Sequence, residues 1–170
     1  MNADQTATTA PDPALFDAVR ACRLAEPLTP DQTAVLAGLM RLESFQAGEL
    51  IGREGATDPH LYAVVEGALG VVAHWGTPEE TLIATLHAGD FAHELGFLDG
   101  SARHASLVAS TPARVLVLAR ERLETLVDTD ARILFLVMCA IVKTVHRAQT
   151  RLSVQAAELT NYIVKQHGRY

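Results

Sequence analysis

The chain has 170 residues, 49% of them hydrophobic, which is enough for one domain with a substantial core. Its formal net charge of −6 argues against a large nucleic-acid-binding face, which needs clustered basic side chains. The longest apolar run, residues 133–142, is shorter than the roughly 20 residues of a membrane helix, so we expect neither nucleic acid nor a membrane as a partner.

The cysteine content and the N-terminus favour a cytoplasmic protein. Cys22 and Cys139 lie far apart in apolar segments, and a disulfide scaffold would need more cysteines, so both are expected to be reduced thiols. Residues 1–12 have neither a basic residue nor an apolar run, and they predict a disordered tail rather than a signal peptide.

Two helices are predicted near the N-terminus. Residues 13–25, PALFDAVRACRLA, carry apolar side chains at helical spacing. In the following LTPDQTAVLAGLM, Thr29 is a good N-cap, Pro30 suits the first helical position, and Gln32 completes a capping box. We expect these helices to end near Arg41.

The middle of the chain, from Ser44 onward, has the pattern of many short strands. Its apolar runs are rich in Val, Ile and Leu and are separated by Gly, Asp and Pro. The clearest runs are 61–65, 68–75, 81–86 and 113–119. No long helical pattern interrupts them, which predicts a sandwich or barrel.

Helical patterns return at Arg120, with a short helix over 120–127 and a long one over 129–164. In the long helix, apolar or small residues recur at alternating steps of four and three for about four heptads. The nine positions with this spacing are 134, 138, 141, 145, 148, 152, 155, 159 and 162, and seven or eight of them hold an apolar or small residue. Packing on the chain's own barrel would explain the early half, whereas a parallel dimer seam, which we favour, would explain both halves.

The stretch FAHELGFLDGSARHAS, residues 91–106, carries the polar groups of most interest. ELGFL predicts one helical turn, which the Asp-Gly pair at 99–100 would end. The N–H groups at a helix start favour an anion, and Arg103 is close enough in sequence to bind the same anion. Glu94 can accept hydrogen bonds from sugar hydroxyls, so the stretch predicts a pocket for a phosphate attached to a ribose.

This stretch resembles the phosphate-binding cassette of the cyclic nucleotide-binding domain family, as in catabolite-activator and kinase-regulatory-subunit effector domains. The family's cassette runs roughly Phe-Gly-Glu, apolar residues, a loop, then Pro-Arg-Ser/Ala-Ala-Thr-Val, and FAHELGFLDGSARHASL follows it without gaps. The similarity spans about residues 25–150 and includes turn glycines at 48, 55 and 67. It implies an α+β, mainly β fold: a double-stranded β-helix jelly roll with N-terminal helices and a long C-terminal helix.

The resemblance also implies ligand contacts within the cassette. Glu94 would bind the ribose 2′-hydroxyl, and Arg103 would pair with the cyclic phosphate. The backbone from Ala92 to Leu95 would donate N–H groups to the phosphate or ribose. The implied ligand is cAMP or cGMP.

The same resemblance places part of the long helix near the base. Residues close to Ala148 would face the purine, and of these Gln149 and Thr150 can hydrogen-bond a base edge. The sequence does not choose between adenine and guanine.

The cassette departs from the family pattern at three positions. His93 stands where the family has Gly, which tolerates a positive φ and lets the backbone approach a ligand. His104 follows the arginine, where it can donate to a phosphate with a charge that depends on pH near neutrality. Ala102 replaces the usual Pro.

The sequence contains only weak motifs for metal binding or catalysis. His87, His93, Glu94 and His104 only loosely imitate the ligand pattern of metal-binding barrels, which resemble His-x-His followed by Glu. The sequence contains no nucleophile elbow, Walker loop or dinucleotide fingerprint. We therefore expect no enzyme activity, no metal and no cofactor.

The predicted organisation is a tail (1–12), a jelly-roll domain with flanking helices (13–150) and a helical extension that forms a dimer seam (151–170). The chain is too short after Thr150 for a helix-turn-helix module, so we expect a stand-alone domain. The favoured function is a cytoplasmic, homodimeric regulatory module that binds a cyclic mononucleotide and signals to an unidentified protein partner. A ligand-free dimeric scaffold is the alternative, and a metal-dependent barrel enzyme is a third possibility.

Overall fold

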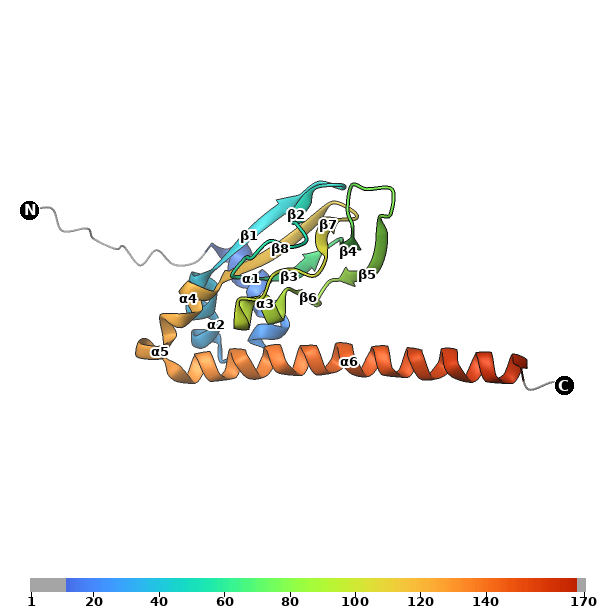
Figure 1. Ribbon diagram of the computed structural model, residues 1–170. Coiled ribbons are helices and arrows are strands. Elements are labelled where there is room, and N and C mark those ends of the chain that lie inside the picture. Colours follow the sequence, from blue (N-terminus) through green and yellow to red (C-terminus); the bar gives the residue numbers. More distant parts are fainter. Residues whose placement is uncertain (1–11, 168–170) are drawn as a thin grey trace, which may run out of the picture.

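Two four-stranded antiparallel sheets face each other in the computed structural model, which describes residues 12–167 (Figure 1). In the second half of the last helix, the structure describes the backbone but not the side chains at 148, 151, 152 and 155–167. The predicted tail also lies outside the described residues, apart from Asp12. The helices are α1 (Pro13–Ala21), the 3-10 turn η1 (Arg23–Ala25), α2 (Pro30–Leu39), α3 (Glu94–Asp99), α4 (Arg120–Glu124), α5 (Leu126–Thr129) and α6 (Ala131–His167).

The strands pair in the orders β1-β8-β3-β6 and β2-β7-β4-β5. Strands that follow one another in sequence mostly lie in different sheets or are not neighbours, and this arrangement confirms the predicted jelly roll. The strands are β1 (Met40–Phe45), β2 (Leu50–Gly52), β3 (His60–Glu66), β4 (Ala68–Ala73), β5 (Thr81–His87), β6 (Phe91–Ala92), β7 (Ser106–Ala109) and β8 (Ala113–Ala119).

Alternation along the central strands divides the core into two layers. On β8, Leu116 and Leu118 pack with the helices, whereas Val115 and Val117 pack against the second sheet. Successive side chains of a strand point to opposite faces, so a strand that is apolar at every position can serve both layers. The four predicted apolar runs correspond to β3, β4, β5 and β8.

The N-terminal helices begin where the sequence predicts and end earlier. Thr29 and Gln32 form the expected reciprocal capping box at α2, with N···O distances of 3.0 and 3.3 Å. The second helix ends close to the expected position near Arg41: α2 stops at Leu39, and Met40 already pairs with Leu118 of β8. The pairing partner is 78 residues away, so a local pattern could not show it.

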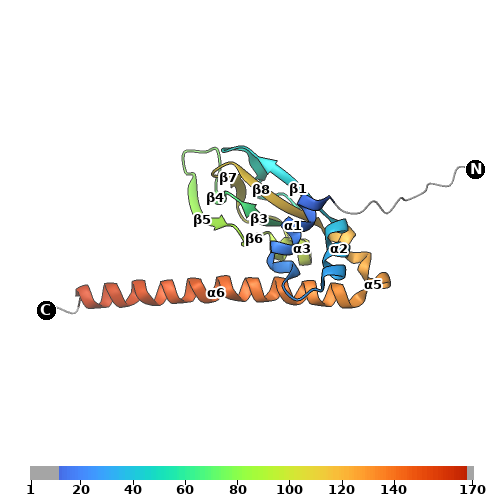
Figure 2. The ribbon, with the colours of Figure 1, turned by 180° about the vertical axis from the view of Figure 1, so that it is seen from behind.

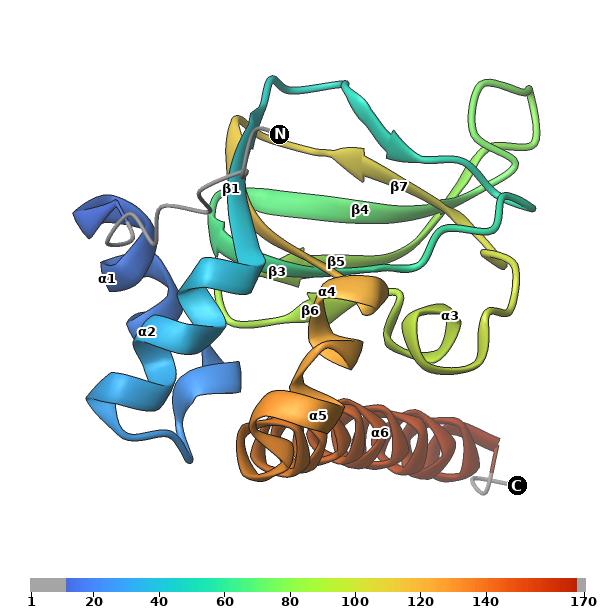
Figure 3. The ribbon, with the colours of Figure 1, turned by 90° about the vertical axis from the view of Figure 1, so that its left-hand side faces the viewer.

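Helix α6 runs along the helical side of the sandwich and continues beyond it (Figure 1). Figure 2 shows α1 and α2 beside its first half, and Figure 3 shows α4 and α5 leading from the sheets to its start. Ile133, Val137 and Ile141 are fully buried at helical spacing, and they fix this half of α6 to the domain.

The early half of the predicted heptad seam therefore packs on the chain's own core. Ile141 is buried, and Leu134, Met138 and Val145 are partly buried against the same cluster. The remaining seam positions, 148, 152, 155, 159 and 162, lie outside the described side chains. Dimerisation along α6 stays a prediction.

Candidate functional site

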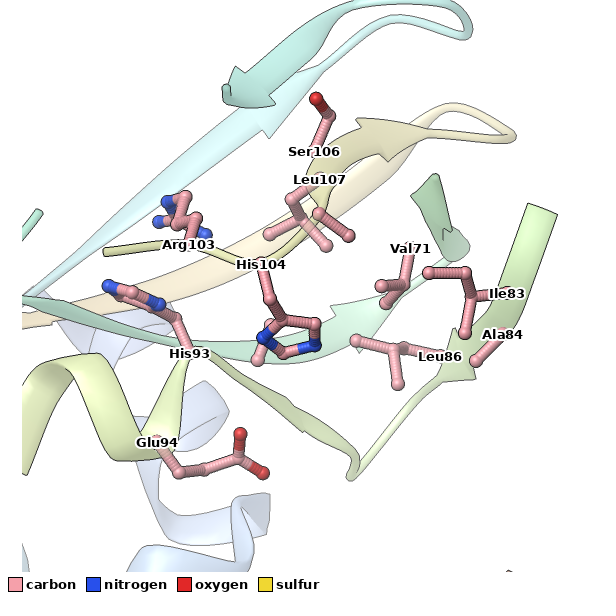
Figure 4. A pocket seen from close by; sticks show the side chains of 12 residues that line it. Val71, Ile83, Ala84, Leu86, His93, Glu94, Arg103, His104, Ser106 and Leu107 are labelled. Carbon is pink, nitrogen blue, oxygen red and sulfur yellow. The ribbon is translucent and has the colours of Figure 1, made fainter. Parts of the chain in front are cut away.

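A pocket of about 320 Å³ opens beside the predicted cassette, between the sandwich and α3 (Figure 4). This volume lies at the lower end of the range for small-molecule sites. One wall is apolar and comes mainly from β4, β5 and β7, with Val71, Ile83, Ala84, Leu86, Ala92, Ala105 and Leu107. The polar lining groups are His93, Glu94, Arg103, His104 and Ser106.

The cassette folds as the sequence predicts. The helical turn is α3, which begins after the short strand β6 and ends at Gly100 in the left-handed conformation (φ 77°). Glycine adopts this conformation without strain, which explains why the Asp-Gly pair ends the turn. Phe97 of α3 is only 1% exposed and fixes the turn to the core. The cassette helix is therefore packed against the core next to the pocket.

Arg103 is buried, with 5% of its surface exposed. Its Nη2 donates to Oδ2 of Asp58 at 2.7 Å, and its Cζ lies 5.1 Å from the centre of the Tyr62 ring. The Nε–H has no hydrogen-bond partner among the described residues. A buried guanidinium with an unused donor favours a negatively charged ligand.

Asp58 joins Arg103 to two residues of β3. The Tyr62 hydroxyl donates to Asp58 at 2.7 Å, and the His60 ring also bonds the carboxylate. Partial burial acts to raise the pKa of Asp58, but the hydrogen bonds from Tyr62, Arg103 and His60 outweigh it and lower the pKa to about 2. Asp58 is therefore ionised at neutral pH and holds Arg103 in place.

Sequence reasoning missed Asp58, His60 and Tyr62. Asp58 is 45 residues from Arg103, and a contact of that separation leaves no local pattern. The one available signal was the spacing of the three polar residues at i, i+2 and i+4, which places them on one face of an extended segment.

Glu94 and Arg103 both line the pocket but point away from each other (Figure 4). Between them, the His104 ring points into the pocket. Burial raises the pKa of Glu94 above its ordinary value. The site thus presents an imidazole between a carboxylate on one side and a guanidinium on the other.

The other predicted site residues are placed less favourably. Ala92 is buried in β6, and the Leu95 side chain is 65% exposed, so only its backbone is suited to the predicted role. Gln149 and Thr150 are exposed on α6, and none of the described α6 residues lines the pocket. Their contact with a base stays a prediction.

His93 adopts the left-handed conformation, with φ 68°, at the position where the family has Gly. Its ring lies over Gly96, where a Cβ would come within 2.0 Å of the ring, and its Nε2 has no partner among the described residues. Burial, and then the positive charge of Arg103, lower the pKa of His93. The side chain is therefore neutral at physiological pH.

We expect His93→Gly to make the protein less sensitive to acid. The unfolded chain protonates His93 near pH 6.5 and the folded chain only at lower pH, so the wild type loses stability as the pH falls below about 6.5. Glycine removes this loss and relieves roughly 1 kcal/mol of backbone strain, partly offset by lost ring contacts. Urea unfolding from pH 8 to pH 5 measures the difference.

Two further variants separate the charge from the backbone strain. His93→Asn tolerates the left-handed conformation and does not titrate, so it should also flatten the profile. His146→Gln, which replaces an exposed histidine of α6 outside the pocket, is the control variant. Parallel profiles for the wild type and His93→Gly would show that His93 does not titrate differently on folding.

Two negative findings apply to the described part of the chain, residues 12–167. No group of three or more His, Cys, Asp or Glu side chains is arranged to hold a metal ion in that part of the chain. Over the same residues, none of the helices has the length and apolar character needed to span a membrane.

Comparisons with known proteins agree with this architecture. A structure described as a cyclic nucleotide-binding domain from Methylobacillus flagellatus superimposes with a TM-score of 0.75 at 20% identity, covering 86% of this chain and 84% of that one. The catabolite activator protein of Thermus thermophilus gives 0.65 at 25% identity, with 81% and 63% covered. The regulatory domain of Toxoplasma gondii protein kinase A, solved with cAMP, gives 0.60 at 20% identity, with 76% and 49% covered.

Sequence comparison points the same way. The chain is 28% identical over 103 residues to isozyme 1 of the cGMP-dependent protein kinase of Drosophila melanogaster. That match covers 59% of this chain but only 13% of the kinase, so it concerns one domain of a much longer protein. The family profile described as "Cyclic nucleotide-binding domain" matches residues 42–130, more than half of the chain and all of the strands from β2 to β8. The chain belongs to the cyclic nucleotide-binding domain family.

Proposed function

We propose that this protein is a regulatory domain that binds a cyclic mononucleotide, cAMP or cGMP, in the pocket beside α3. The observation that carries the proposal is Arg103, which lines a 320 Å³ pocket at the cassette of this family. Arg103 is buried, and its Nε–H has no hydrogen-bond partner in the part of the chain that the structure describes. A cyclic phosphate is small and singly charged, and it suits one fixed guanidinium better than a cluster of lysines.

The positions of the polar side chains indicate where the phosphate and the ribose of the ligand would bind. Arg103 and the neighbouring His104 would bind the phosphate, and backbone N–H groups from Ala92 to Leu95 would complete its contacts. Glu94, on the other side of the pocket, would accept a hydrogen bond from the ribose 2′-hydroxyl. Because Asp58 bonds only one nitrogen of the guanidinium, Arg103 can bind a phosphate without breaking this ion pair.

The apolar wall supplies a surface for the base. Ile83 is 56% exposed although it is large and apolar, and it lines the pocket with Val71 and Leu86. Covering such side chains with a purine would remove apolar surface from water. None of these side chains carries a polar group that reads a base edge, so the choice between adenine and guanine falls to Gln149 and Thr150 or to other groups.

We further propose a homodimer that signals to a protein partner through α6. The exposed face of α6 carries Phe135 and Val142, one heptad apart and 65% and 60% exposed. Ligand would act by changing the position of the cassette against α6 and thereby the surface offered to the partner. The expected cytoplasmic location and the absence of catalysis belong to this proposal.

The alternative is a dimeric scaffold whose pocket no longer binds a nucleotide. It is favoured by one observation: His93 places an imidazole where the family has no side chain, and this ring lines the pocket. In this case the ion pair of Arg103 with Asp58 would serve stability alone.

Isothermal titration calorimetry of the full chain with cAMP, cGMP and the linear control 5′-AMP separates these functions. We expect saturable, one-site binding of at least one cyclic nucleotide and a weaker response to 5′-AMP. No heat with either cyclic nucleotide would contradict the sensor and leave the scaffold. Sedimentation velocity on the same samples tests the dimer, which a single monomeric species at all concentrations would exclude.

A further inference from the structure

The segment from β2 to β3 encloses Arg103 on several sides. Both backbone polar groups of Arg103 form hydrogen bonds with this segment: the N–H donates to the carbonyl oxygen of Ala56 at 2.9 Å, and the C=O accepts from the N–H of Gly55 at 2.7 Å. Its side chain pairs with Asp58 and lies against Tyr62. We call Gly52, Gly55, Ala56, Asp58 and Tyr62 the arginine cradle.

Gly52 has no side chain, and this leaves room for the Arg103 guanidinium in the arginine cradle. A Cβ at Gly52 would lie 2.6 Å from both Cζ and Nε of Arg103 and 3.0 Å from its Nη2. Carbon atoms do not approach a guanidinium this closely, so any side chain at 52 requires Arg103 to move. Gly52 belongs to the sheet of β2 and Tyr62 to the sheet of β3, so the guanidinium lies between the two sheets.

A positive φ does not explain the glycine at position 52. The described glycines with positive φ are 48, 55, 67, 76, 89 and 100, and Gly52 is not among them. Gly52 is also in a strand, where glycine is generally unfavourable. The register of β2 against β7 shifts between Leu50 and Gly52, where glycine is tolerated. The register shift does not require the side chain to be absent, whereas the guanidinium beside Gly52 does.

We propose that Gly52 is a positioning residue for the anion site: its missing side chain leaves the place in which Arg103 is held for a phosphate. This inference rests on the proposed function for its effect on nucleotide binding but not for its effect on Arg103. The guanidinium is the end of a flexible side chain, so Gly52→Ala should displace it while the domain stays folded. The expected result is a loss of affinity, with a loss of stability no larger than that of Arg103→Ala.

The test compares Gly52→Ala with Gly38→Ala, since a Cβ at Gly38 meets nothing within 4 Å. Affinity for cAMP and cGMP should fall at least tenfold in Gly52→Ala and stay unchanged in Gly38→Ala. The Nε–Hε resonance of Arg103, identified by its absence in Arg103→Lys, should shift in Gly52→Ala without any ligand. An unchanged resonance and an unchanged affinity would overturn the positioning role.

A double variant separates the guanidinium from the strand itself. Lysine lacks the planar group that Gly52 accommodates, so Gly52→Ala should have little further effect in the Arg103→Lys background. If Gly52→Ala alone fails to fold, a folded Gly52→Ala/Arg103→Lys protein still supports the contact, and an unfolded one overturns it. If the wild type binds neither nucleotide, the proposed function fails, while the resonance still decides the role of Gly52.

Discussion

Arg103→Ala is expected to abolish detectable binding of cyclic nucleotides and to lower the free energy of unfolding by about 3 kcal/mol. The stability loss has a clear cause, because the variant leaves Asp58 ionised without its guanidinium partner. Asp58 keeps its bonds to Tyr62 and His60 and is 20% exposed, which places the loss at the lower end for a broken buried pair. Urea unfolding and calorimetric titration measure the two effects.

Arg114→Ala is the matched control for this experiment. Arg114 also forms an ion pair, with Glu66 at 2.9 Å, but both side chains are exposed and neither residue lines the pocket. Exposed pairs contribute less than about 1 kcal/mol, so this variant should stay stable and bind the nucleotide normally. If Arg103→Ala does not fold, Arg103→Lys takes its place, because it keeps the positive charge. It should bind the nucleotide more weakly than the wild type. Wild-type affinity in Arg103→Ala would remove the phosphate-binding role.

Phe97→Ala is expected to destabilise the protein by about 4 kcal/mol and to weaken nucleotide binding. Phe97 is 1% exposed and is the main apolar contact between the cassette helix α3 and the helical core. Its loss leaves a cavity directly beneath the turn that carries Glu94. The unfolding midpoint in urea gives the change in stability, and titration gives the change in affinity.

Leu95→Ala provides the comparison within the same helix. Leu95 is 65% exposed and its backbone N–H remains in the variant, so stability should change by less than about 1 kcal/mol and binding should persist. If Phe97→Ala does not fold, Phe97→Leu takes its place, because it keeps an apolar side chain at this position of the core. Equal destabilisation by Phe97→Ala and Leu95→Ala would show that α3 is not fixed through Phe97.

Several features of the fold could be predicted because their causes are local. The capping box of Thr29 and Gln32 depends on two residues three positions apart. The end of α3 depends on Gly100, which alone permits the left-handed turn at that point without strain. The strands β3 and β8 could be recognised from runs of branched apolar residues, although their pairing could not. The gapless match to the cassette then identified the family, and the profile over residues 42–130 confirms it.

The candidate site could be predicted only in part. Glu94, His93, Arg103 and His104 all line one pocket, as the cassette implied. Their orientation was not predictable: the chain bends at residues 104 and 105, just before β7, and only the folded chain shows that the His104 ring points into the pocket between Glu94 and Arg103. Sequence reasoning also overlooked Asp58, which determines where the guanidinium is held.

Local sequence patterns were therefore enough to predict the element types, the family and the residues of the cassette, because helix caps, strand patterns and turn glycines act over a few neighbouring positions. The contacts of Arg103 with Asp58 and Gly52, and the packing of the early α6 seam on the chain's own core, became visible only in the folded chain. These contacts join segments brought together by strand pairing across two sheets. The free energy of such a contact depends on the distance between the two groups in space. The number of residues between them along the chain gives almost no information about that distance.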